Sequence, residues 1–143
     1  MSEIFYSEEM KRFEQEQFLR KSSYSFMLRA GGQIFKFINK NFKNKHPIII
    51  LCGPGNNGGD GLVIARRLMD HGYPVKVYIF SSVNNYKGDA LRALKEFRGD
   101  LKKINLFKLQ KNALIVDALF GIGLKRNIKG ILSKVFRKIN KFI

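Results

Sequence analysis

The residues of this chain best suited to chemistry lie in a glycine-rich stretch, residues 53–61. Five of its nine positions are glycine, and Asn56, Asn57 and Asp60 stand between them. Glycine lets a backbone adopt positive φ and come close to a ligand, while amide and carboxylate side chains supply the oxygen atoms that hard cations prefer. The stretch therefore predicts a ligand-binding turn. The simpler alternative is a tight turn in which Asn and Asp only cap the next helix.

A second candidate is Asp117, which ends an apolar stretch and precedes a glycine-containing loop. Together with Asn57 it could supply oxygen ligands to a hard cation. Asp is also a common turn former, so a purely structural role remains the alternative. In the loop that follows, Lys125 and Arg126 either contact phosphates or form a solvated surface pair.

The glycine-rich stretch also contains the literal pattern G-x-G-x-x-G at residues 53–58, which alone is weak evidence for a dinucleotide site. An NAD site of the usual kind has an acidic residue at the end of the second strand. Here the second apolar run, residues 75–80, is followed by Ser81 and Ser82. No Gly-Lys-Ser/Thr sequence is present, which excludes a P-loop.

Three apolar runs predict strands, and each is followed by a segment of helical periodicity. The strands are expected at residues 48–51, 75–80 and 113–116, and the helices near residues 57–71, 88–97 and 128–139. Two more helices, near residues 7–18 and 24–42, are expected before them, and residues 102–109 could hold a short strand. This alternation predicts an α/β fold with a doubly wound parallel sheet, whose ligands bind beyond the carboxyl ends of the strands.

Two segments of the chain resemble a known family. Residues 53–68, GPGNNGGDGLVIARRL, and residues 116–124, VDALFGIGL, are similar to the signatures of the YjeF N-terminal domain, the NAD(P)H-hydrate epimerase family. Weaker echoes lie at residues 27–31 and 87–90. The resemblance implies that residues 1–143 form one partial domain. Its expected fold is a Rossmann-like three-layer αβα sandwich with a mainly parallel sheet, incomplete at the C-terminus.

The resemblance also implies an activity, which is the epimerisation of the R and S forms of hydrated NADH and NADPH for cofactor repair. It implies a bound K⁺, with Asn57 and Asp117 as ligands. The substrate-binding residues that it implies are Asn56, Asn57, Gly58, Gly59, Asp60, Gly121, Ile122, Gly123, Leu124, Lys125, Arg126 and Asn127.

The chain departs from the family at its C-terminal end. The family continues into a strand ending in Asp-Ile-Pro-Ser-Gly and a later lysine-bearing strand, and neither motif occurs here. Catalytic groups are therefore expected beyond Ile143, and the epimerase activity of this chain alone is in doubt. The sheet is expected to keep an open edge, which favours pairing with another chain. The resemblance further implies two partners, a homodimer mate and an NAD(P)H-hydrate dehydratase, separate or fused.

Composition bounds the remaining alternatives. The 143 residues carry a net charge of +16, but the basic residues are scattered, with no aromatic-interleaved RNA motif. A basic nucleic-acid-binding protein is thus the weakest of three hypotheses, behind the epimerase and a non-catalytic nucleotide-binding module. The apolar runs are too short to span a bilayer, so no membrane partner is expected. Cys52 is the single cysteine, and no signal peptide is visible, which together indicate the cytoplasm.

Overall fold

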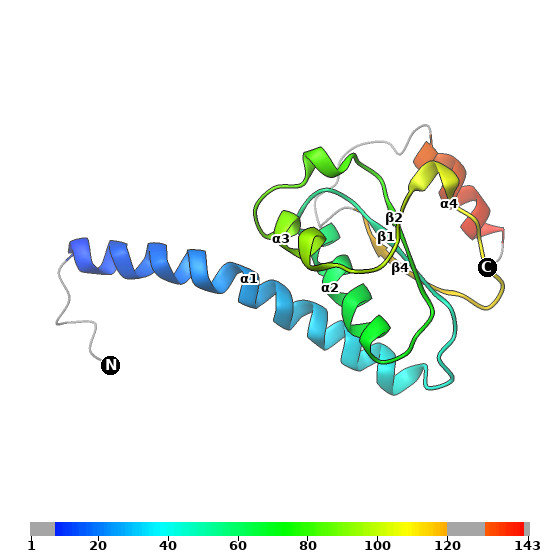
Figure 1. Cartoon of the computed structure of the whole chain (residues 1–143), viewed down its shortest axis with the longest axis horizontal. Coiled ribbons are helices and arrows are strands. Elements are labelled where there is room, and N and C mark those ends of the chain that lie inside the picture. Colours follow the sequence, from blue (N-terminus) through cyan, green and yellow to red (C-terminus); the bar gives the residue numbers. More distant parts are fainter. Residues whose placement is uncertain (1–7, 120–130, 142–143) are drawn as a thin grey trace.

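The computed structural model describes residues 8–119 and 131–141, and its centre is a four-stranded parallel sheet (Figure 1). The strand order is β3-β2-β1-β4, and each neighbouring pair is parallel. The strands are β1 Ile48–Cys52, β2 Val75–Ile79, β3 Leu101–Lys103 and β4 Leu114–Ala118. The predicted α/β class with a parallel sheet is confirmed, and the short strand expected in residues 102–109 is β3, which begins one residue earlier.

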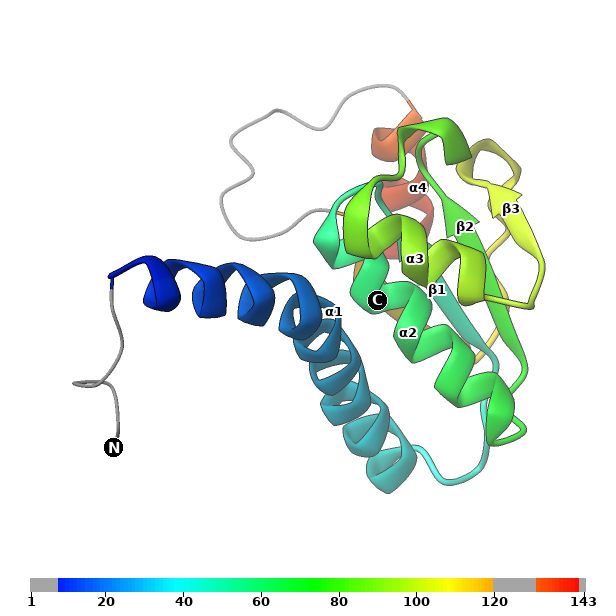
Figure 2. The same cartoon turned by 60° about the vertical axis from the view of Figure 1, so that its left-hand side comes forward.

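Helices cover both faces of this sheet. The helices are α1 Glu8–Asn41, α2 Asn56–Asp70, α3 Gly88–Glu96 and α4 Ile131–Asn140, with short 3₁₀ turns η2 Val83–Asn85 and η3 Ile104–Leu106. Figure 2 shows α1, α2 and α3 on one face and α4 on the other, while the N-terminal part of α1 projects away from the sheet. The arrangement is the three-layer αβα sandwich expected from the sequence.

The side chains of β1 point alternately to the two faces of the sheet, and this alternation explains the layers. All five of its residues are buried, as expected for a central parallel strand. Ile48, Ile50 and Cys52 belong to the larger core under α1, α2 and α3. Ile49 and Leu51 face the smaller core that includes residues of η3 and α4.

The N-terminal region differs from the sequence prediction, because α1 is one continuous helix of 34 residues and not two helices. No glycine or proline lies between residues 18 and 24, so the segment lacks the residues that most strongly interrupt a helix. Gly31 lies in the helix interior and serves packing. A Cβ there would lie 2.5 Å from Val63 Cγ1, so the glycine lets α1 approach α2 closely.

Smaller differences concern the loops and the strand ends. Asp117 lies near the carboxyl end of β4 as predicted, and the strand continues one residue further, to Ala118. The predicted polar loop at residues 81–87 contains η2. Of the helix expected over residues 128–139, the part from residue 131 onward is confirmed as α4, and the remainder lies outside the described residues.

The free side of β4 forms one edge of the sheet in the described part of the chain. Leu114, Ile115 and Val116 are only half-buried, whereas their partners in β1 are fully buried. A cavity of about 1040 Å³ lies beside this strand, between β4 and the end of α4. Within residues 8–119 and 131–141, no helix is long and apolar enough to cross a bilayer.

Candidate functional site

The two signature segments meet at the carboxyl ends of β1 and β4. The backbone N–H of Gly53 donates a hydrogen bond to the carbonyl O of Ala118 at 3.0 Å. The chain continues from β1 into α2 on one face of the sheet, whereas α4, the next described element after β4, lies on the other face. This is a topological switch point, where open α/β sheets bind their ligands.

Glycine is required here because the backbone approaches itself closely. A Cβ on Gly58 would lie 1.7 Å from the carbonyl O of Gly53, and a Cβ on Gly53 would lie 1.9 Å from the carbonyl O of Leu119. Positive φ is not the reason, since the positive-φ glycines of the described residues are Gly72 and Gly88. The predicted positive φ is therefore wrong for this turn. Its glycines are needed because backbone atoms pack too closely there to leave room for a Cβ.

The turn leads directly into α2, whose N-cap is Gly55 and makes no side-chain capping bond. Gly55 therefore occupies the N-cap position that the alternative gave to Asn or Asp. The first N–H groups of a helix have no carbonyl partner inside it, and they lie at the positive end of its dipole. A 15-residue helix that begins at such a turn is suited to an anionic group such as a phosphate.

Two further segments pack against the same turn. A Cβ on Gly59 would lie 3.1 Å from Ala90 Cα and 2.5 Å from Met27 Cε. The weaker sequence echoes at residues 27–31 and 87–90 therefore both reach the glycine turn. The tertiary structure brings together four segments that are far apart in the sequence.

The two acidic candidates have different surroundings. Asp60 is half-buried in α2, and burial raises the pKa of its carboxyl group above the ordinary value. Asp117 is exposed, and its Oδ1 accepts the backbone N–H of Leu119 at 3.0 Å. That bond confirms the turn-forming role considered for Asp117. A carboxylate has two oxygens with several lone pairs, so the bond is compatible with binding a cation as well.

A cation site of the predicted kind would use Asn57 in the first turn of α2 and Asp117 near the end of β4. Their amide and carboxylate oxygens are chemically suited to a hard cation such as K⁺. Among the described residues, no group of three or more His, Cys, Asp or Glu could hold a metal ion. The second predicted substrate loop, residues 121–127, lies outside the described residues.

Two other side chains carry groups that could take part in chemistry, the thiol of Cys52 and the hydroxyl of Tyr86. Cys52 is fully buried, and burial raises the pKa of its thiol, so it is a core residue as predicted and not a nucleophile. Tyr86 was not singled out from the sequence. Its side chain is buried, and its hydroxyl has no hydrogen-bond partner within the part of the chain that the structure describes. Tyr86 directly precedes residues 87–90, which weakly resemble the family, and this position could have marked it as a candidate site residue.

Comparison with protein families places the chain among known proteins. The model of the family described as YjeF-related protein N-terminus matches residues 23–142. A protein of Rhodobacter capsulatus named NAD(P)H-hydrate epimerase is 34% identical over 91% of this chain and 67% of its own length. A protein of Dictyoglomus turgidum named bifunctional NAD(P)H-hydrate repair enzyme Nnr is 42% identical over 94% of this chain. The chain spans only 28% of that longer relative.

A solved structure agrees with the sequence comparisons. Yeast ynu0 superimposes with a TM-score of 0.63 at 26% sequence identity. The match covers 80% of this chain and 54% of the yeast chain. The yeast chain therefore extends well beyond the matched part.

Proposed function

This chain belongs to the YjeF-related protein N-terminus family, and from that premise we propose that it is an NAD(P)H-hydrate epimerase domain acting on hydrated NADH and NADPH. The observation that carries the proposal is the hydrogen bond from Gly53 to Ala118, because it joins the two family signatures at the switch point of the sheet. Relatives at 34% and 42% identity carry names that refer to the epimerase or to hydrate repair.

In this proposal the glycine turn binds the anionic part of the substrate. The N–H groups at the start of α2 would receive a phosphate, and residues 56–60 would line the pocket together with residues 121–127. The close backbone contact at Gly58 keeps the turn compact, so that no side chain blocks the approach of the ligand. Asp60, whose carboxyl group is half-buried, would accept or donate a hydrogen bond to the substrate.

K⁺ would be held by Asn57 and Asp117, and would supply a fixed positive charge beside the substrate phosphates. Both side chains offer oxygen ligands, and Asp117 is kept in place by its bond to the Leu119 N–H. Inversion at the hydrated nicotinamide carbon also needs acid–base groups, and neither the glycine turn nor Asp117 is assigned that role.

The proposal also concerns partners and location. The substrate would come from the hydration of NADH or NADPH, and its repair needs a dehydratase. We infer that the dehydratase acts either as a separate protein or as a fused domain, since two relatives at 42% and 34% identity are named bifunctional. A homodimer and a cytoplasmic location complete the proposal.

The decisive experiment is an epimerisation assay on hydrated NADPH, with a binding titration alongside. The purified chain should bind hydrated NADPH, and K⁺ should tighten the binding relative to Na⁺. Equal binding of hydrated NADPH by the wild type and a folded Asp117→Ala variant in K⁺ would contradict the cation assignment. Failure to bind either hydrate would contradict the epimerase proposal and leave the sequence similarity without a substrate.

A further inference from the structure

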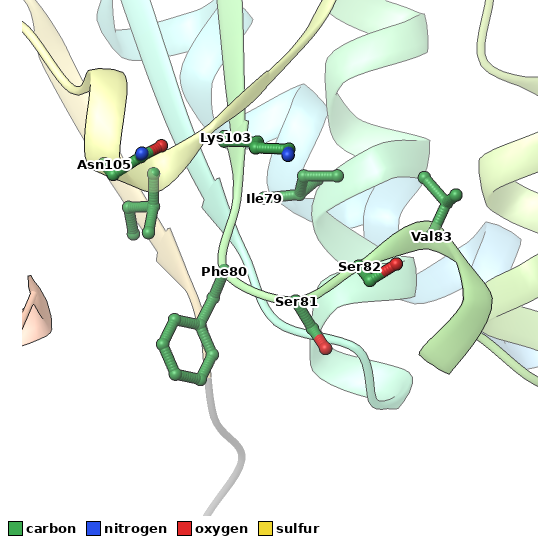
Figure 3. A pocket seen from close by; sticks show the side chains of 8 residues that line it. Ile79, Phe80, Ser81, Ser82, Val83, Lys103 and Asn105 are labelled. Atoms are coloured by element: carbon green, nitrogen blue, oxygen red, sulfur yellow. The ribbon is translucent and has the colours of Figure 1, made fainter.

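A second pocket lies at the carboxyl ends of β2 and β3, away from the two signature segments. It has a volume of about 390 Å³, and Figure 3 shows the side chains that line it. Its polar side chains come from the loop after β2 and from the end of β3 with the turn that follows: Ser81, Ser82, Lys103 and Asn105. The only charged side chain in its lining is Lys103, so the pocket favours an anion.

This pocket shares the ligand-binding edge of the sheet with the glycine turn. The backbone N–H of Phe80 donates to the carbonyl O of Cys52 at 2.9 Å, and Cys52 directly precedes Gly53. Parallel strands lie about 4.8 Å apart, so the end of β3 is about 10 Å from the end of β1. A ligand with two nucleotide halves can therefore occupy the glycine turn and this pocket together.

The two serine hydroxyls of this pocket act as acceptors within the protein, so each can still donate a hydrogen bond to a ligand. Ser81 Oγ accepts a bond from Asn85 Nδ2 at 2.6 Å, and Ser82 Oγ accepts the backbone N–H of Asn84 at 3.4 Å. Each hydroxyl keeps its own proton for another acceptor. Both serine hydroxyls and the Lys103 ammonium group line the same pocket, and donors of this kind are suited to the oxygens of a phosphate monoester.

In dinucleotide-binding sheets, residues after the second strand contact the adenosine ribose. An acidic residue there binds the 2′-hydroxyl, whereas a basic residue nearby accommodates a 2′-phosphate. In this chain the loop after β2 has Ser81 and Ser82 in place of an acid, and β3 supplies Lys103. The Phe80 ring, 38% exposed, borders the same pocket and offers an apolar surface to the ribose or base.

We propose that this pocket binds the 2′-phosphate of hydrated NADPH and makes the protein prefer NADPH hydrate to NADH hydrate. The inference rests on the proposed function, because it assumes a pyridine dinucleotide as the ligand. It adds a specificity site that involves neither the glycine turn nor Asp117.

The test compares two probes, ADP-ribose and ADP-ribose 2′-phosphate, by isothermal titration. The wild-type chain should bind the phosphorylated probe more tightly. Lys103→Met should reduce that affinity about tenfold, as expected for loss of a charge-assisted hydrogen bond, while the affinity for ADP-ribose stays unchanged. Inorganic phosphate should compete only weakly with the phosphorylated probe, which distinguishes a dinucleotide site from a general phosphate site.

Lys102→Met is the matched control, because it removes the same charge from the neighbouring position of β3 and Lys102 does not line this pocket. It should leave the preference intact, and thermal unfolding should show that both variants are folded. Equal wild-type affinity for the two probes, or equal losses in both lysine variants, would overturn the proposal. The epimerase function is judged separately with NADH hydrate, which lacks the 2′-phosphate, so the two failures remain distinguishable.

Discussion

The backbone N–H of Gly53 donates to the carbonyl O of Ala118 at 3.0 Å, so the first residue of the glycine turn lies beside the residue that follows Asp117. In the strand register, Cys52 and Ala118 are partners, as are Leu51 and Asp117. A change in the backbone of either segment must therefore affect the other. This coupling makes the glycines of the turn the first positions to test.

Gly58→Ala should damage both stability and ligand binding. A Cβ at this position would lie 1.7 Å from the carbonyl O of Gly53, so the backbone must move, at a cost of about 1–3 kcal/mol. Gly55→Ala is the control, because a Cβ there meets nothing within 4 Å and should cost less than about 1 kcal/mol. Urea unfolding and titration with hydrated NADPH measure both effects. Equal stability of the two variants would contradict the close-contact explanation.

Asp60→Asn should stabilise the protein near neutral pH and weaken substrate binding. Burial raises the pKa of this carboxyl group in the folded state, so folding favours its protonated form. The stability that this gives is complete below the unfolded pKa, and it is lost as the pH rises through the folded pKa and the buried group must ionise. The variant should thus gain thermal stability over wild type between about pH 3 and pH 7. Asp100→Asn, at an exposed loop position, is the matched control for the loss of one negative charge.

Tyr24→Phe should loosen the attachment of α1 to α3. Tyr24 Oη donates to Glu96 Oε2 at 2.6 Å, and burial followed by this bond raises the pKa of Tyr24 to about 12. The loss should be about 1 kcal/mol at pH 7, because Glu96 is partly exposed. The same bond lowers the pKa of Glu96, so the contribution is present above the unfolded pKa and disappears as the pH falls through the folded value. Urea unfolding of both proteins should therefore differ at pH 7 and converge at low pH.

Cys52 should resist thiol reagents in the folded protein. The side chain is completely buried, and burial raises the pKa of the thiol, so both access and thiolate are lacking. Labelling with a coloured disulfide reagent should be slow in buffer and rapid in denaturing urea. Fast labelling of the folded chain would show that the core around β1 opens readily.

The chain should associate at high concentration through the unpaired side of β4. In the described structure, β4 is paired on one side only, and an apolar-lined cavity of about 1040 Å³ lies next to it. Sedimentation velocity over a range of concentrations measures this association. A chain that stays strictly monomeric at every concentration would contradict this expectation.

Patterns of contiguous residues were enough to predict the main strands and helices, the sheet type and the family of this protein. The apolar run that forms β1, the glycine-rich turn and the helical periodicity of α2 are contiguous in sequence, so their order and type could be read directly. The alternation of strands and helices then determined the parallel sheet and the edge at which ligands bind. The resemblance of residues 53–68 and 116–124 to one family rested on the same contiguous residues.

Only the tertiary structure decided how these segments meet. The need for glycine at position 58 comes from the carbonyl of Gly53, and the need at position 53 comes from Leu119, a contact between distant parts of the chain. The pocket of Ser81 and Lys103 likewise joins the loop after β2 to the end of β3. Such contacts depend on strand pairing and packing between elements, and periodicity along the sequence carries no information about which distant atoms come within a few ångströms of each other.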